Sequence, residues 1–404
     1  MMRSYIRNVS SIFALLSIIF IPFPFHLFQI QIALTDFLFG GLIKVSAQNL
    51  LQINLQDTRV YSDFVSMYLL VFLLFIIALL TAFLLSFNKD WRKKNHNFFE
   101  IVRYVAIAYL TVHLLKYGVD KIFKNQFYQP EPNILFTPFG KLNKGMLYWS
   151  TMGTSHFYSV FLGVAEVLAA LLLFFNRTRL SGLLLSLFLF LNIVAINFAF
   201  DISVKLFSLF LLFLTLFLLA PYIKSLWRFL FGKSTNEVSD SLLKGKWHNG
   251  NYFIYGTVKS LIGALILLEA FYPFANSHTL NSDNLKKPLL YGAYKVIESP
   301  GINDSLQTAS EINMFFIHKD GYLIFQDKNN IMKDYRLEYD TSGNYLLLID
   351  YQMKRTLVPY YYSSGDSILK LNFKIEGVGL NIEGKAIDIS KLPALEKGFH
   401  WTVD

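Results

Sequence analysis

The sequence predicts a polytopic all-α membrane bundle of about seven transmembrane helices, followed by a C-terminal all-β meander domain that is a small barrel or a sandwich. Of the 404 residues, 54% are hydrophobic and only 16% are charged, whereas a soluble protein carries about 25% charged residues. The deficit lies in residues 1–275, where long apolar runs recur, and the composition after about residue 280 is that of a soluble domain. The chain therefore combines two units with different solvent preferences.

Composition also excludes several classes of site. The chain has no cysteine, which rules out disulfides, thiolate nucleophiles, zinc–thiolate sites and cysteine-ligated iron–sulfur clusters. The net charge is +9, but the basic residues cluster in short loops between apolar runs, where they set membrane orientation. We therefore expect the lipid bilayer, and no nucleic acid, as a partner.

The N-terminus resembles a signal peptide, because basic residues 1–7 precede an apolar stretch at 11–21. A cleavage-like Val45-Ser46-Ala47 lies far beyond that stretch, and Pro22 and Pro24 intervene. We favour an uncleaved first helix over a signal peptide.

A spanning helix needs about 20 mostly apolar residues. Seven windows meet this requirement, at residues 9–30, 62–87, 100–123, 156–175, 180–200, 203–222 and 252–273. They define four regions: N-terminal helices at 1–99, a four-helix unit at 100–222, a basic loop and last helix at 223–275, and a soluble β-rich domain at 285–404.

Orientation follows from the basic residues of the loops, since these favour the cytoplasmic side. With seven spans, one side collects Arg3, Arg7, Lys89, Arg92, Lys93, Lys94, Arg177, Arg179, Lys224, Arg228, Lys233, Lys244 and Lys246. This arrangement predicts a protein of the bacterial cytoplasmic (inner) membrane whose C-terminal domain is extracytoplasmic. An error of one helix would reverse the prediction.

The region after about residue 289 has short β-branched and aromatic runs separated by turns, which indicates about eight strands. Residues 314–319 and 322–327, joined by Asp320-Gly321, predict a hairpin. Further turns are expected at 341–344, 363–366 and 377–379. Tyr360-Tyr361-Tyr362 could line a ligand cavity, but we expect them to fill the core.

Ionisable residues inside a span are functional candidates, because burying them in lipid is costly. Glu166 is the clearest case, and Gly163 and Ala170 share its helix face, which allows a neighbouring helix to approach closely. Glu166 would serve either as a proton carrier or head-group ligand, or as half of a structural pair.

The 100–123 window carries further polar residues. His113, Tyr117 and Lys121 form a stripe at i, i+4 and i+8, and Lys116 and Asp120 form an i, i+4 pair. For Asp120 and Lys121 we favour the alternative that their side chains snorkel to the membrane interface. For His113 we favour a hydrogen-bonded helix contact over a proton or metal site.

Asn197, Asp201 and Lys205 run from the fifth window into the next turn. They align only if the helix continues, and we favour the alternative that Asp201 and Lys205 cap two helix ends. His113, His156, Glu166 and Asp201 lack any metal-ligand spacing, so no metal site is predicted.

Several phrases resemble DoxX-like membrane proteins. Tyr117–Phe123 resembles the Gly-x-x-Lys-[LIVF]-Phe phrase that ends that family's first helix, and Gly163–Glu166 with the basic Arg177–Arg179 resembles its next helix. Residues 100–222 are similar to the family's four-helix unit. Asn197–Lys205, Leu218–Pro221 and Gly398–Trp401 resemble a larger bacterial subgroup with a C-terminal β domain.

The resemblance marks Lys121, Glu166 and Arg179 as family-like positions, and it implies a quinone- or redox-linked membrane component of unassigned reaction. Quinone is then the implied cofactor, and a membrane redox protein the implied partner. The alternative function is non-enzymatic: binding or transport of lipid or another small molecule, or scaffolding, through the β domain.

Overall fold

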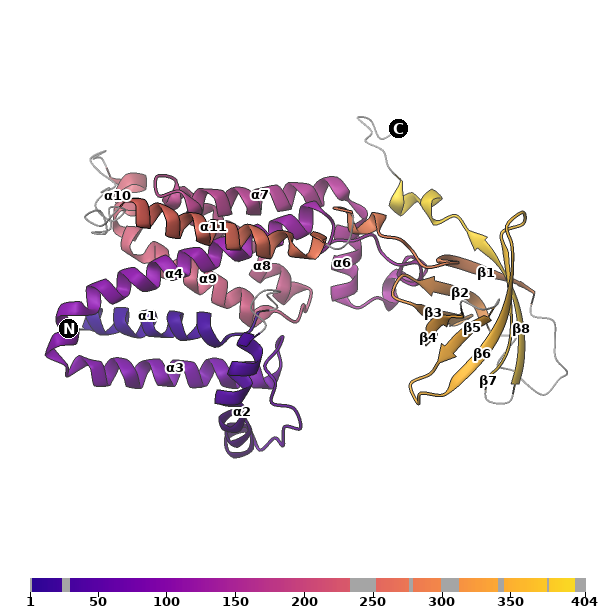
Figure 1. Cartoon of the computed structure of the whole chain (residues 1–404), viewed down its shortest axis with the longest axis horizontal. Coiled ribbons are helices and arrows are strands. Elements are labelled where there is room, and N and C mark those ends of the chain that lie inside the picture. The colour runs from indigo at the N-terminus through magenta and orange to yellow at the C-terminus, as the bar shows by residue number, and fades with distance from the viewer. Residues whose placement is uncertain are drawn as a thin grey trace. The chain divides into compact units, whose positions relative to one another are not determined.

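The computed structural model describes residues 2–23, 30–232, 252–275, 279–298, 312–340, 345–375 and 378–396. The chain forms two compact units (Figure 1). The first contains Met1–Gln126 and Phe157–Leu280, and the second contains Phe127–His156 and Asn281–Asp404. Residues 127–156, which the predicted four-helix unit at 100–222 includes, therefore belong with the β-rich unit.

The first unit is a helical bundle. Its helices are α1 (Met2–Phe20), α2 (Ile30–Leu51), α3 (Val65–Ser86), α4 (Lys89–Ile122), α7 (His156–Phe174), α8 (Arg179–Ala199), α9 (Lys205–Leu219), η2 (Ala220–Tyr222), α10 (Ile223–Phe231) and α11 (Tyr252–Ala275). Within the described residues, six helical segments are long and apolar enough to cross a membrane, and the apolar parts of α1 and α11 are shorter. The chain is thus a multi-pass membrane protein, as its composition predicts.

Six of the seven predicted windows each coincide with a helix, but the first is wrong in its bounds. The window 9–30 combines the end of α1, which stops at Phe20 just before Pro22, with the start of a helix that the sequence analysis missed. That helix, α2, contains Asp36, Lys44 and the Gly40-Gly41 pair, which interrupt its apolar run. The loop positions Lys233, Lys244 and Lys246 lie outside the described residues.

Helices α1 and α3 lie side by side in opposite directions. Val9 and Ile12, near the start of α1, pack against Ala78 and Ala82, near the end of α3. The Tyr5 hydroxyl donates a hydrogen bond to the Leu79 carbonyl over 3.3 Å. α1 also packs against α4, which in turn contacts α9 and α11.

The second unit contains a closed antiparallel barrel in which each strand pairs with the next in the chain, and β8 pairs with β1. The strands are β1 (Gly292–Glu298), β2 (Ile312–His318), β3 (Tyr322–Asp327), β4 (Met332–Tyr339), β5 (Tyr345–Ile349), β6 (Arg355–Ser363), β7 (Ile368–Ile375) and β8 (Val378–Ile387). This confirms the all-β meander and selects the barrel. The predicted hairpin is β2–β3, closed by Gly321 at φ +73°.

Side chains fill the barrel interior. The core consists of Tyr294, Phe315, Ile317, Leu323, Phe325, Tyr335, Leu337, Leu346, Leu348, Val358, Leu369, Leu371 and Ile382. Of the tyrosine triplet, Tyr360 packs against this core, whereas Tyr361 and Tyr362 are exposed, so the expected core role fits Tyr360 alone. The turn at 363–366 falls between β6 and β7, and the predicted features at 341–344, 377 and 398–401 lie outside the described residues.

Residues 127–156 include a stretch that lies against the barrel's outer face. They form α5 (Pro132–Leu135), η1 (Phe139–Lys141) and α6 (Lys144–Thr154). Phe136 stacks on Phe316 of β2 with ring centroids 6.0 Å apart, within a second apolar cluster that includes Met314 and Ile324. β2 is therefore buried on both faces, with Phe315 and Ile317 inside the barrel and Met314 and Phe316 under this cover.

Candidate functional site

The candidate site is an ion pair buried between α4 and α7. The Lys121 ammonium lies 2.9 Å from Oε1 and 2.7 Å from Oε2 of Glu166, and donates to both oxygens. The two side chains are 8% and 4% exposed. Lys121 and Glu166, predicted separately as intramembrane candidates, thus contact each other directly.

Two glycines let the helices approach closely enough for this pair. A Cβ built on Gly163 would lie 2.5 Å from the Gly118 carbonyl oxygen, and one on Gly118 would lie 2.8 Å from the Gly163 carbonyl oxygen. Ser159, one turn before Gly163, donates a hydrogen bond to the Lys121 carbonyl over 2.7 Å. The small residues on the Glu166 face therefore allow close packing of a neighbouring helix, as expected, and that helix is α4.

The predicted stripe continues from the ion pair along α4. The Lys121 ammonium lies 5.4 Å from the centre of the Tyr117 ring, and that ring lies 6.4 Å from the His113 ring. His113 Nδ1 is 2.8 Å from the Tyr109 carbonyl, and Phe23 packs against the His113 ring at 4.3 Å. His113 is thus a hydrogen-bonded contact in aromatic surroundings, as its sequence context favours.

A second pair adjoins the first. Lys116 Nζ lies 3.5 Å from Asp120 Oδ2, and Asn125 donates to Asp120 Oδ1 over 3.0 Å. The side chains of Asp120 and Lys121 are 11% and 8% exposed. Both side chains are therefore enclosed by protein, and the favoured prediction that they reach out to the membrane interface is wrong.

The buried ion pair of Lys121 and Glu166 is not explained by helix packing alone. Its desolvation cost offsets much of its attraction, and replacing a buried ion pair by apolar groups is often neutral or stabilising. The helix interface alone does not require these charges. Their geometry suits proton exchange between ammonium and carboxylate, or competition by a polar ligand for either charged group.

The residues of the α8–α9 turn form a different arrangement. Asn197 donates to the Val204 carbonyl over 3.4 Å, and Asp201 adopts φ +52° and forms a 2.7 Å ion pair with Lys205. α8 ends at Ala199, so no continuous helix aligns the three.

The prediction that Asp201 caps the start of α9 is wrong, because another aspartate accepts the hydrogen bonds there. Asp63, from the loop before α3, accepts hydrogen bonds from the backbone N–H groups of Lys205 and Leu206 at 2.8 and 3.0 Å. The helix start thus has the expected carboxylate, but Asp63 supplies it in place of Asp201.

The two arginines of the basic turn differ. Arg177 is exposed. Arg179 is buried and donates to the side-chain oxygen of Asn176 at 2.6 Å and to the Leu173 carbonyl at 3.4 Å. Its guanidinium therefore supplies a hydrogen-bond donor to a carbonyl group in the last turn of α7, which is a structural role.

The sequence analysis missed a buried carboxylate in the barrel unit. Glu131 lies 3.3 Å from the Lys319 ammonium and 3.8 Å from His318 Nε2. Burial raises the pKa of Tyr291, and the charge and hydrogen bond of Glu131 raise it further. No sequence signal joins Glu131 to a hairpin turn that lies 188 residues further along the chain.

No group of three or more His, Asp or Glu side chains in the described ranges is arranged to hold a metal ion.

The chain is similar to a curated bacterial protein. A curated protein of Bacillus subtilis (strain 168), described as "Uncharacterized protein YwoB", is 36% identical over 112 residues, which are 28% of this chain and 70% of the relative. No family model matches the chain. No solved structure matches it.

Proposed function

We propose that this chain, which belongs to the same family as YwoB of Bacillus subtilis, is a quinone- or redox-linked component of the bacterial cytoplasmic membrane. The proposal rests on the geometry of the buried ion pair. The observation that carries the proposal is the pair of Lys121 and Glu166, which is held between two helices and nearly inaccessible to solvent. Intramembrane charges of this kind mark ligand or proton sites more often than lipid-facing positions.

The chemistry of the pair suits a quinone head group. A quinone presents two carbonyl oxygens on an apolar ring, so a site for it needs an apolar slot and a few polar groups. Lys121 supplies a donor, Glu166 an acceptor, and the Tyr117 ring packs beside the ammonium. The resemblance of Lys121 and Glu166 to DoxX-like positions supports the same assignment.

The proposed orientation follows from the bundle ends. Arg7 of α1 donates to Asn95 of α4 over 3.2 Å, which places the N-terminus beside the basic start of α4. The α7–α8 turn with Arg177 lies at the same end (Figure 1). We propose that this end is cytoplasmic. The chain then leaves the bundle for the β-rich unit from the extracytoplasmic ends of α4 and α11.

The alternative, small-molecule binding or scaffolding by the β domain, has weaker support. Side chains fill the barrel interior. Among the described residues, an open cleft of about 190 Å³ lined by Lys333, Tyr335, Asp350 and Lys354 offers one place for a ligand.

The test is mass spectrometry of quinones and lipids that co-purify with the protein. We expect a quinone in the wild type that is lost in Glu166→Gln, which removes the carboxylate charge. Glu100→Gln is the matched control, because Glu100 pairs with Arg103 in the same helix at 3.2 Å. Equal quinone content in all three proteins at matched folding and yield would refute the proposal.

A further inference from the structure

We infer that α2 does not cross the membrane, although it is long and apolar enough, but lies along the lipid–water interface at the bundle end where α1 finishes. Its partner is the bilayer surface itself. The inference goes beyond the proposed function, and only the choice of leaflet rests on that function's orientation.

The directions of the flanking helices α1 and α3 are incompatible with a single crossing by α2. The start of α1 packs against the end of α3 through Val9 and Ala82, and through the hydrogen bond from Tyr5 to Leu79. The end of α1 and the start of α3 therefore lie at the same end of the bundle. A single crossing by α2 between them would place them at opposite ends.

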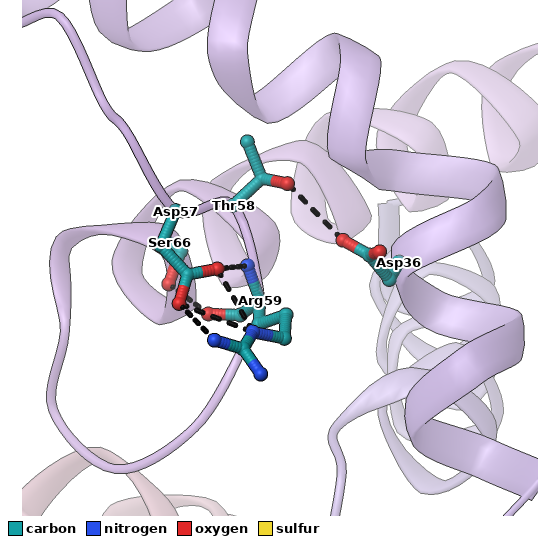
Figure 2. Close-up of polar contacts among 5 residues, drawn as sticks. All are labelled: Asp36, Asp57, Thr58, Arg59 and Ser66. Carbon is teal, nitrogen blue, oxygen red and sulfur yellow. Dashed lines mark hydrogen bonds and ion pairs between the residues drawn. The ribbon is translucent and has the colours of Figure 1, made fainter.

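A double crossing is excluded by the loop that follows α2. Only residues 52–64 separate it from α3, and Figure 2 shows how this loop is held. Thr58 donates to Asp36 of α2 over 3.1 Å, and Ser66 of α3 donates to the Arg59 carbonyl over 2.9 Å. A non-helical segment cannot cross lipid with its backbone groups unpaired.

The same loop carries a local ion pair at its exposed tip. Arg59 forms a 2.8 Å ion pair with Asp57, and its hydrogen bonds hold the pKa of the Asp57 carboxyl below its usual range. Further along, Asp63 caps α9. These contacts place the loop at the end of the bundle where α8 finishes and α9 begins.

The start of α2 is fastened to the end of α1. The Gln31 amide donates to the carbonyls of Ile19 and Ile21, both at 2.9 Å, and Thr35 donates to the Phe20 carbonyl at 2.9 Å. These carbonyls end a helix and would otherwise lack partners in an apolar setting. α2 then runs across the ends of its neighbours rather than parallel to them (Figure 1).

The surface that α2 leaves uncovered is apolar. Its buried stripe consists of Thr35, Phe39, Gly40, Ile43 and Ala47. The exposed residues include Ile30, Leu34, Phe37, Leu38, Leu42 and Val45, with Phe37 85% and Ile30 77% exposed. A face of this kind in water would drive association.

Lipid is the occupant favoured by continuity. α2 packs against α3, whose exposed Phe72 and Phe75 belong to a helix that crosses the membrane. Lys44, the exposed cation of α2, has a stem long enough to reach the head groups. In the proposed orientation the leaflet is the extracytoplasmic one.

Single-cysteine labelling tests the crossing, since the natural chain has no cysteine. We expect Ser4→Cys and Gln56→Cys to react with an impermeant thiol reagent from opposite sides of the membrane, and Lys89→Cys to react from the side of Ser4. If α2 crosses, Ser4 and Gln56 react from the same side, which overturns the inference. If the protein has the reverse orientation, each cysteine reacts from the side opposite to the one proposed, but Ser4→Cys and Gln56→Cys still react from different sides. A wrong orientation is therefore distinguished from a crossing by α2.

Spin labels at Phe37→Cys and Val45→Cys in full-length protein in vesicles test the lipid contact. An interfacial helix gives both labels a similar, shallow depth by collision with oxygen and a water-soluble nickel complex. A spanning helix separates them by about 12 Å in depth. That separation, or labels shielded from lipid by water or a second copy of the chain, would contradict the inference.

Discussion

At the residue scale, the close packing of α4 and α7 depends on the absence of a Cβ atom at Gly163. An added Cβ would lie 2.5 Å from the Gly118 carbonyl oxygen, a backbone atom that cannot move away alone. We expect Gly163→Ala to lower stability by about 1–3 kcal/mol, the cost of overpacking, and to weaken the contact between Lys121 and Glu166. Thermal unfolding in detergent measures the change.

The matched control is Gly41→Ala. Gly41 also lies in a helix, but nothing lies within 4 Å of its Cβ position. There the substitution should be neutral or stabilising, since alanine is favoured over glycine in helices by about 1 kcal/mol. Equal melting temperatures for the two variants would show that the helix crossing is not tight.

The role of a residue was predictable from the sequence where it depends on neighbouring residues in the chain. Glu166 stands in an apolar run with Gly163 on its face, and both features carry over into the structure. Its partner was not predictable, because Lys121 lies 45 residues away on another helix. Asp201 likewise is a residue type that often caps helices, but the distant Asp63 accepts the hydrogen bonds at the start of α9.

At the element scale, the start of α9 depends on a residue outside it. Asp63→Ala should destabilise the bundle by about 1 kcal/mol, the typical value of a helix cap, because the N–H groups of Lys205 and Leu206 lose their acceptor. Asp57→Ala, in the same loop but exposed, should have a smaller effect. The two melting temperatures decide the comparison, and equal losses would contradict a capping role.

Helix α2 shows why one element escaped prediction. The mean hydropathy of its most apolar stretch is well below that of α3. Asp36 and Lys44 lower that value, and their positions make sense only in three dimensions, where Asp36 accepts from the loop and Lys44 is exposed. A hydropathy scale designed for spans underestimates a helix that lies across them.

At the scale of the whole molecule, the division into a bundle and a barrel follows from composition, because lipid and water select different side chains. The assignment of residues 127–156 to the barrel unit does not. It depends on Phe136 and Glu131 contacting strands nearly two hundred residues further along the chain.

The barrel unit should lose stability in alkali. Burial raises the pKa of Tyr339 to about 12, and coupling to Tyr360 adds to the effect. The unfolded phenol ionises near pH 10, so this contribution is fully present below about pH 10 and is lost as pH rises through about 12. Tyr339→Phe should reduce the fall in melting temperature between about pH 8 and about pH 11, and the exposed control Tyr345→Phe should not. An identical fall in all three proteins would contradict the assignment.

The central claim is that Lys121 and Glu166 bind a ligand rather than merely hold two helices together, and the double variant Lys121→Met/Glu166→Gln tests it most directly. Breaking a buried pair from one side costs about 3–5 kcal/mol, whereas removing both charges is often neutral or stabilising. The double variant should therefore be folded, with a melting temperature near that of the wild type in thermal unfolding. Native mass spectrometry should show that it has lost the bound quinone. A double variant that keeps the quinone of the wild type would contradict the claim and make the pair structural.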